Sequence, residues 1–187
     1  MKKIIYSPGE PSGIGPDLII KLSSSKLWEN LKIPIVSIGD PKLFIDRAAL
    51  LKKKIKIIEL ESLNEVCKNT KGLIQIIKVA KCSNTRPGKL YKSNAQYVLN
   101  NLTYSIEQTM QNEETALVTG PLSKENIISI DKLFIGHTEY IKKITKSKDV
   151  LMMLASDQLR VALATTHIPL KNVPRTCLLY TSDAADD

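Results

Sequence analysis

The sequence predicts an α/β protein with a largely parallel sheet. Short apolar runs typical of buried strands alternate with stretches whose apolar residues recur at helical spacing. Capping residues and Pro/Gly turns separate these segments. The 187 residues are 43% hydrophobic and 25% charged. This is the composition of a globular domain, so it excludes a disordered tail, a collagen-like fibre and a disulfide-stapled miniprotein.

The expected strands are short and spread along the chain. They cover residues 3–7, 33–38, 54–58, 73–79 and 115–119. Two further apolar runs, 150–155 and 159–165, are separated by Ser-Asp-Gln, which predicts a hairpin. We expect the strand at 115–119 and the strand that leads to residue 165 to be buried, because their residues are mainly apolar.

Helices are predicted between the strands. The first spans about residues 17–25 and follows a Pro/Gly loop. The second begins with Asp40 as N-cap and Pro41 as first helical residue. A capping box that starts at Ser93 opens a third, longer helix. The residues expected to face the core are Phe44, Ala48 and Leu51 in the second helix, and Ala95, Val98, Leu99, Leu102 and Ile106 in the third.

The charge pattern argues against a nucleic-acid partner. The net charge is +8, but only four of the 27 basic residues are arginines, and the lysines are dispersed except at 52–54 and 142–148. Nucleic-acid binders usually cluster arginines and interleave aromatics, so we expect a solvated lysine surface, compatible with an anionic small substrate. No run of 18 apolar residues exists, and the apolar N-terminal stretch is too short for a signal peptide. We therefore expect a cytoplasmic protein with no membrane partner.

The segment SPGEPSGIGPD, residues 7–17, forms a stiff loop between the first strand and the first helix. Gly13 and Gly15 have the spacing that begins a dinucleotide fingerprint, but Leu18 stands at its third glycine position. This departure argues against a Rossmann site. The loop follows a strand, where open α/β sheets bind ligands. A purely structural turn is an equally open interpretation.

Two later motifs could bind an anion. In TGPLSK, residues 119–124, Ser123 or Lys124 could reach an anion, although Ser123 is also a routine helix N-cap. In FIGHTE, residues 134–139, His137 and Thr138 offer an imidazole, a hydroxyl and backbone N–H groups at a predicted helix start, a set that suits phosphate. The alternative is that Thr138 caps the helix and His137 is a passive surface residue.

His167 follows the apolar run 161–164, and Pro169 prevents the strand from continuing. A histidine at a strand end is well placed to ligate a metal or to transfer a proton. A structural histidine is the alternative.

Taken together, these motifs resemble one family. The segments 8–17, 86–90, 118–127, 134–140 and 152–170 match, in order and spacing, the 4-hydroxythreonine-4-phosphate dehydrogenase family of vitamin B6 synthesis. The resemblance covers about residues 3–174. It implies a homodimeric oxidoreductase with an α/β/α sandwich of the isocitrate/isopropylmalate dehydrogenase type and an active site shared between subunits.

The resemblance also implies a chemistry. Such enzymes use NAD or NADP and a divalent metal, zinc, magnesium or cobalt, to oxidise 4-phosphooxy-L-threonine. The product, 2-amino-3-oxo-4-phosphooxybutanoate, decarboxylates to 3-amino-2-oxopropyl phosphate in pyridoxine 5'-phosphate synthesis. His137 and Thr138 correspond to substrate-binding positions, and His167 to a metal ligand. The same family leaves open another phosphorylated hydroxy acid, such as a four-carbon sugar acid phosphate.

Family members are nearly twice as long as this chain. Residues 1–175 therefore correspond to the N-terminal portion of a truncated two-domain α/β dehydrogenase, comprising the first domain and the start of the central domain. Residues 176–187 have neither helix nor strand periodicity and resemble the read-through of a sequencing adapter. We expect this tail to be non-native.

Overall fold

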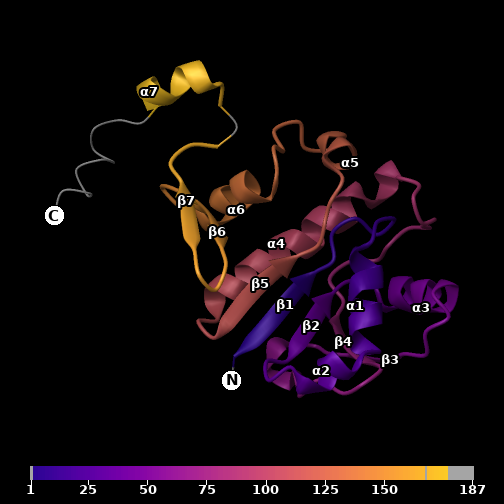
Figure 1. Cartoon of the computed structure of the whole chain (residues 1–187). Helices are drawn as coiled ribbons and strands as arrows, with labels where there is room; N and C mark the ends of the chain where they lie inside the picture. The colour runs from indigo at the N-terminus through magenta and orange to yellow at the C-terminus, as the bar shows by residue number, and fades with distance from the viewer. Residues whose placement is uncertain (1, 167, 177–187) are drawn as a thin grey trace. The chain divides into compact units, whose positions relative to one another are not determined.

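A computed structural model describes residues 2–166 and 168–176 (Figure 1). The chain divides into two compact units, Met1–Thr145 and Lys146–Asp187. No helix in the described ranges has both the length and the apolar character needed to cross a membrane.

The first unit is built on a five-stranded sheet in which every pairing is parallel. The strands, in the order in which they lie in the sheet, are β3 (Lys56–Glu59), β4 (Leu73–Ile77), β2 (Ile35–Ile38), β1 (Lys3–Ser7) and β5 (Thr115–Thr119). Within this register, Ile5 lies opposite Val36 of β2 and Leu117 of β5. The predicted parallel sheet is confirmed, and all five strands end at one edge.

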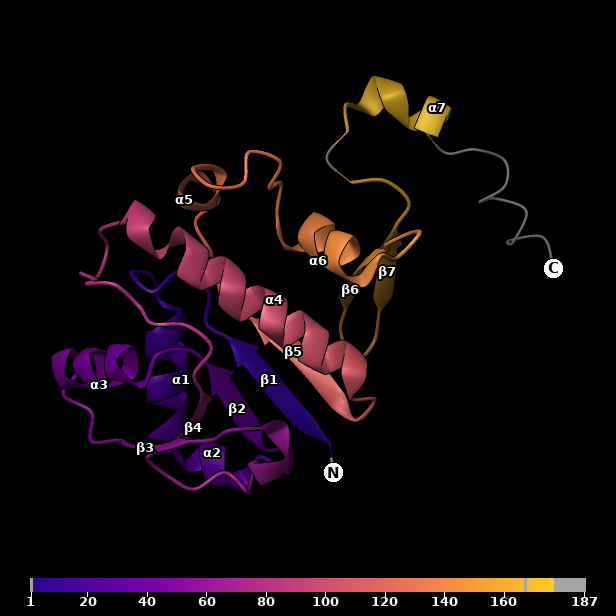
Figure 2. The ribbon, with the colours of Figure 1, turned by 180° about the vertical axis from the view of Figure 1, so that it is seen from behind.

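Helices cover both faces of this sheet (Figures 1 and 2). The helices of the first unit are α1 (Gly15–Ser23), α2 (Lys26–Asn30), α3 (Pro41–Leu50), α4 (Ala95–Gln111), α5 (Lys124–Ile128) and α6 (His137–Thr145), with short 3₁₀ turns at Leu63–Glu65 and Lys92–Asn94. Successive strand residues point to opposite faces. Ile4 and Tyr6 pack in a cluster with Ile19 of α1, whereas Ile5 packs in a second cluster that includes Tyr104 of α4. The result is the expected α/β/α layering.

Two local predictions need correction. The predicted burial of β5 is wrong: its residues alternate between half-buried and exposed, because it is the edge strand of the sheet within the described residues. The predicted capping box at Ser93 is also wrong. The helix α4 begins at Ala95 after a 3₁₀ turn, and Asn94 makes no side-chain cap, because its Oδ1 accepts a hydrogen bond from Ser83 N at 2.8 Å.

Other predicted details are confirmed. Asp40 caps α3 by accepting a hydrogen bond from Lys42 N at 3.1 Å, and Pro41 is the first residue of that helix. Phe44 and Ala48 of α3 are buried, as predicted. The lysines at 52–54 are exposed, as expected for a solvated surface.

The second unit contains an antiparallel hairpin of β6 (Met152–Ala155) and β7 (Arg160–Leu163), followed by a 3₁₀ turn at Leu170–Asn172 and α7 (Val173–Thr176). The hairpin is confirmed. The predicted burial of its second strand is wrong, since three of the four residues of β7 are exposed and the fourth is half-buried. A two-stranded hairpin has too few strands to bury its own side chains.

A buried guanidinium group connects three segments of the first unit. Arg47 of α3 is 4% exposed. Its Nη2 donates to the carbonyl of Pro11 at 2.7 Å, and its Nη1 lies 3.1 Å from Oδ1 of Asp17 in α1. Arg47 therefore fixes the loop after β1 to both helices on that face of the sheet.

Replacing Arg47 with Ala should lower the free energy of unfolding by about 2–4 kcal/mol, because it leaves the partly buried Asp17 carboxylate without its ion-pair partner and the Pro11 carbonyl without its donor. Urea unfolding followed by the fluorescence of Trp28, which is buried and bonded to the Thr70 carbonyl, would measure the loss. The matched control is Lys42→Ala. Its ion pair with Asp46 is exposed, so its loss should cost less than about 1 kcal/mol. Equal losses in the two variants would contradict the role of Arg47.

Candidate functional site

The candidate site lies at the edge where the parallel strands end. Two loops meet there, residues 8–14 after β1 and residues 120–123 after β5; we call them the edge loops. Gly120 N donates to the carbonyl of Ser7 at 2.7 Å, and Glu10 N donates to the carbonyl of Pro121 at 2.9 Å. The backbone of each loop is thus bonded to the other, and both hold a fixed position relative to β1.

Glycines allow the edge loops to approach so closely. A side-chain carbon on Gly9 would overlap the Pro121 carbonyl, and one on Gly15 or Gly120 would overlap the Pro8 carbonyl. Gly9 also has a φ of +79°, which favours glycine. The Gly13-x-Gly15 spacing that resembles a nucleotide fingerprint therefore serves backbone packing, in agreement with the absence of a Rossmann pattern in the sequence.

A buried carboxylate joins the first edge loop to α5. Glu10 is 4% exposed; its Oε1 accepts from Ser12 N at 3.2 Å and its Oε2 from Asn126 Nδ2 at 3.1 Å. Asn126 Nδ2 also lies 3.1 Å from the carbonyl of Tyr91. The predicted role of Ser123 as N-cap of α5 is confirmed, because its Oγ accepts from Asn126 N at 3.2 Å. The bond between Glu10 and Asn126 fixes α5 on the first edge loop.

The segment 86–90 also reaches this edge. Gly88 N donates to the carbonyl of Ser12 at 2.9 Å, so the turn formed by these residues lies against the first edge loop. Gly88 has a φ of +77°, but a side-chain carbon there would meet no atom within 4 Å. The turn at 86–90 therefore lies between the first edge loop and the solvent.

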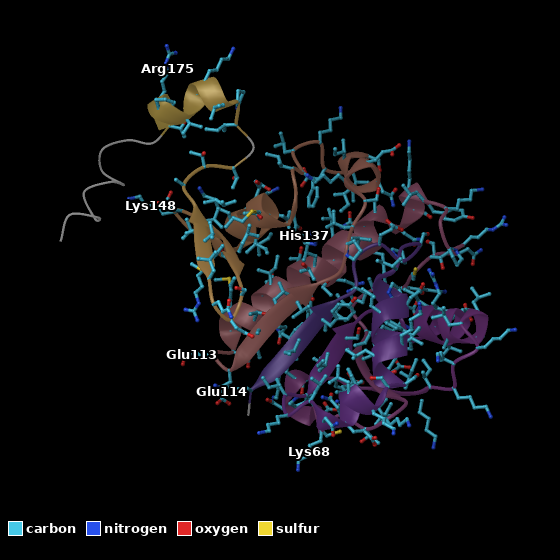
Figure 3. The ribbon with its side chains drawn as sticks, in the orientation of Figure 1. Lys68, Glu113, Glu114, His137, Lys148 and Arg175 are labelled. Atoms are coloured by element: carbon cyan, nitrogen blue, oxygen red, sulfur yellow. The ribbon has the colours of Figure 1, made fainter. Side chains whose placement is uncertain are left out.

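His137 is the first residue of α6, which places Thr138 inside the first turn (Figure 3). The alternative interpretation of Thr138 as N-cap is therefore wrong. Phe134, which is buried, packs against Tyr140 with ring centroids 5.5 Å apart. The Tyr140 hydroxyl lies 2.7 Å from Thr103 Oγ1 of α4. The start of α6 is thus held against α4 by an aromatic contact and a hydrogen bond.

The environment of His137 keeps its imidazole neutral. Burial lowers the pKa of His137, and the positive charge of Lys124 lowers the pKa further. Lys124 is the first residue of α5 and His137 the first residue of α6, and both helices follow β5 along the chain. At neutral pH, His137 can therefore donate a hydrogen bond from one ring nitrogen and accept one at the other.

The structure does not test the metal prediction. His167 lies outside the described residues. Among residues 2–166 and 168–176, no group of three or more His, Cys, Asp and Glu side chains could hold a metal ion.

Two of the residues that shape this edge carry no recognisable sequence pattern. Arg47 belongs to an ordinary amphipathic helix, and Asn126 is one polar residue among several after Ser123. Glu10 carried a weak signal, since it is the one charged residue within the Pro/Gly run 8–16. Its partner Asn126 is 116 residues away, and only the fold shows their pairing.

Replacing Gly9 with Ala should destabilise the first unit by more than replacing Gly88 with Ala. Both glycines have a positive φ, so both variants carry a backbone cost of about 1–2 kcal/mol. Only Gly9→Ala adds overlap with the Pro121 carbonyl. The difference would be read from the urea midpoints of Trp28 fluorescence, and equal midpoints would show that the edge loops can separate at no cost.

The fold and the site define an α/β protein whose ligand-binding edge follows the carboxyl ends of a parallel sheet. A family described as "Pyridoxal phosphate biosynthetic protein PdxA" matches residues 30–179. The chain belongs to this family.

Named relatives agree with this assignment. A 4-hydroxythreonine-4-phosphate dehydrogenase of Citrobacter koseri is 36% identical over 173 residues, and one of Yersinia pseudotuberculosis is 37% identical over 172 residues; each match covers 92% of this chain and 51% of the relative. The chain therefore spans about half the length of the curated relatives it matches.

Solved structures show the same fold. A putative 4-hydroxythreonine-4-phosphate dehydrogenase from Salmonella typhimurium superposes with a TM-score of 0.81 and 26% identity, over 94% of this chain and 55% of that one. An enzyme of the same name from Burkholderia phymatum gives a TM-score of 0.82 and 25% identity, over 94% and 53%. The predicted α/β/α fold is confirmed over the part of these structures that the chain covers.

Proposed function

We propose that this chain is the N-terminal part of an NAD- or NADP-dependent dehydrogenase that oxidises 4-phosphooxy-L-threonine. Membership of the family described above supports the reaction class. The observation that carries the proposal is the placement of His137 and Thr138 at the start of α6, beyond the carboxyl end of β5. We infer that these two residues bind the substrate's phosphate.

The chemistry of the α6 start fits a phosphate dianion. The first backbone N–H groups of a helix have no partner within the helix, and the helix dipole is positive at that end. The Thr138 hydroxyl and the neutral His137 imidazole add two uncharged donors. A bound phosphate would favour the protonated imidazole, so it should raise the pKa of His137.

In the proposed reaction, the C3 hydroxyl of the substrate would lose its proton while the hydrogen on C3 left as a hydride, for which NAD or NADP would be the acceptor, so that C3 becomes a carbonyl carbon. The product ketone, 2-amino-3-oxo-4-phosphooxybutanoate, then loses carbon dioxide to give 3-amino-2-oxopropyl phosphate. A divalent metal, when bound, would polarise the hydroxyl and the developing carbonyl. The described residues do not supply its ligand set. His167 as a zinc, magnesium or cobalt ligand stays a prediction.

We further propose that the intact enzyme is a cytoplasmic homodimer whose active site is shared between subunits. The half-length match leaves room for the other metal ligands and substrate contacts in the remainder of a longer chain. The dispersed lysines and the small number of arginines argue against nucleic acid and are compatible with a small anionic substrate.

In an enzyme that carries this sequence at full family length, Thr138→Ala should raise KM for 4-phosphooxy-L-threonine by about fivefold to a hundredfold. The reason is that a charged acceptor loses one donor, at a cost of about 1–3 kcal/mol. Steady-state kinetics would measure it. Lys53→Glu serves as the control. Lys53 is exposed and precedes β3, so it lies at the amino end of the strands, away from the edge loops. Its kcat and KM should therefore stay within a few-fold of those of the unmodified enzyme. An unchanged KM in Thr138→Ala would refute the phosphate assignment.

The 187-residue chain alone should bind zinc or cobalt no more tightly than micromolar and should not reduce NAD. Catalytic metal sites usually need about three protein ligands, and His167 is the one strong candidate in this sequence. Isothermal titration of the chain and of His167→Ala, beside an NADH absorbance assay, tests this. Sub-micromolar binding that His167→Ala abolishes, together with NADH production, would overturn the expectation.

A further inference from the structure

Lys124 lies next to the start of α6 although it belongs to α5. A side-chain carbon placed on Gly136 would lie 3.5 Å from Cε and 3.6 Å from Nζ of Lys124. Gly136 directly precedes His137, and the positive charge of Lys124 acts on the His137 imidazole. The ammonium group therefore lies beside the residues that we propose to bind phosphate.

A carboxylate of the chain also lies beside Gly136. The carboxylate Oε2 of Glu139, in the first turn of α6, would lie 3.3 Å from the same side-chain carbon on Gly136. The ammonium group and the carboxylate thus both approach Gly136, whose lack of a side chain leaves the room. A carboxylate in the first turn of a helix is favoured by the positive end of the helix dipole, as an anionic ligand would be.

The position of Lys124 is set by buried bonds. Ser123, the preceding residue, caps α5, and Asn126, two residues further, is 3% exposed and bonded to the buried carboxylate of Glu10. These bonds leave α5 little freedom to rotate. The long side chain of Lys124 is exposed, so it can follow a ligand without disturbing the core.

We propose that the ammonium group of Lys124 is a third binding group for the phosphate at the start of α6, and that phosphate competes there with the carboxylate of Glu139. This inference rests on the proposed phosphate-binding role of His137 and Thr138. Lys124 supplies the full positive charge that the neutral imidazole and the hydroxyl do not. The Glu10–Asn126 pair is a positioning element that acts through α5.

The test is titration of the 187-residue chain with inorganic phosphate, followed by the imidazole NMR signals of His137. The chain has only two histidines, so His137→Gln assigns the signal. The variants are Lys124→Gln, Lys124→Arg, Glu139→Gln and Thr138→Ala. Lys53→Gln is the matched control, because it removes the same charge from an exposed lysine at the other edge of the sheet. Ionic strength is held constant, because salt screens exposed charges.

We expect Lys124→Gln to weaken phosphate binding about three- to fivefold, the range of an exposed ion pair. Lys124→Arg should keep the affinity, Glu139→Gln should increase it, and Lys53→Gln should leave it unchanged. Without phosphate, Lys124→Gln should also raise the pKa of His137, since a neighbouring cation is removed.

Two results would overturn the inference, and they can be distinguished. If Thr138→Ala weakens binding while Lys124→Gln does not, Lys124 is not part of the site, and the proposed role of His137 and Thr138 stands. If phosphate leaves the His137 signal of the unmodified chain unchanged, the phosphate site and the role of Lys124 both fail.

Discussion

The site depends on backbone hydrogen bonds between the ends of two neighbouring strands, β1 and β5. The Ser7 and Pro121 carbonyls accept hydrogen bonds from Gly120 and Glu10, and glycines remove the side chains that would separate the loops. Parallel pairing brings the two strand ends to one edge, although more than 100 residues separate them in sequence. These bonds fix the position of the loop after β5, from which α5 and the segment that leads to α6 continue.

Buried polar groups hold the helices next to the edge loops in place. Arg47 fixes the first edge loop from the side of α3, and Glu10 fixes α5 through Asn126. Unpartnered, each of these groups would be costly to bury, so each has a strong preference for its observed partner. These pairings fix the positions of the first edge loop, α3 and α5 more specifically than apolar contacts alone would. The His137 imidazole and the Lys124 ammonium group then lie close together because the backbone beneath them is fixed.

Much of this architecture could be predicted from local sequence. Alternating apolar segments predict the parallel sheet, Asp40-Pro41 predicts a helix start, and Ser123 predicts another. The failures are of two kinds. Burial of β5 and β7 was inferred from apolar residues, but burial depends on which strands lie alongside, and local sequence does not carry that information. The capping box predicted from Ser93 does not form: Asn94 precedes the helix, and its side chain bonds to Ser83 N, a tertiary partner that local sequence does not show. The pairs Glu10–Asn126 and Arg47–Pro11 could not be predicted, since their members are distant in sequence.

Native-state hydrogen exchange tests the central claim most directly. If the edge loops form one rigid body with the sheet, the amide protons of Glu10 and Gly120 should be protected as strongly as those of β1, and should lose protection together with them as denaturant is added. The amide of Lys89, which donates to the Arg86 carbonyl within an exposed turn, provides the reference for a hydrogen-bonded amide outside the sheet and the edge loops. Exchange of the Glu10 and Gly120 amides as fast as that of Lys89 would contradict the account.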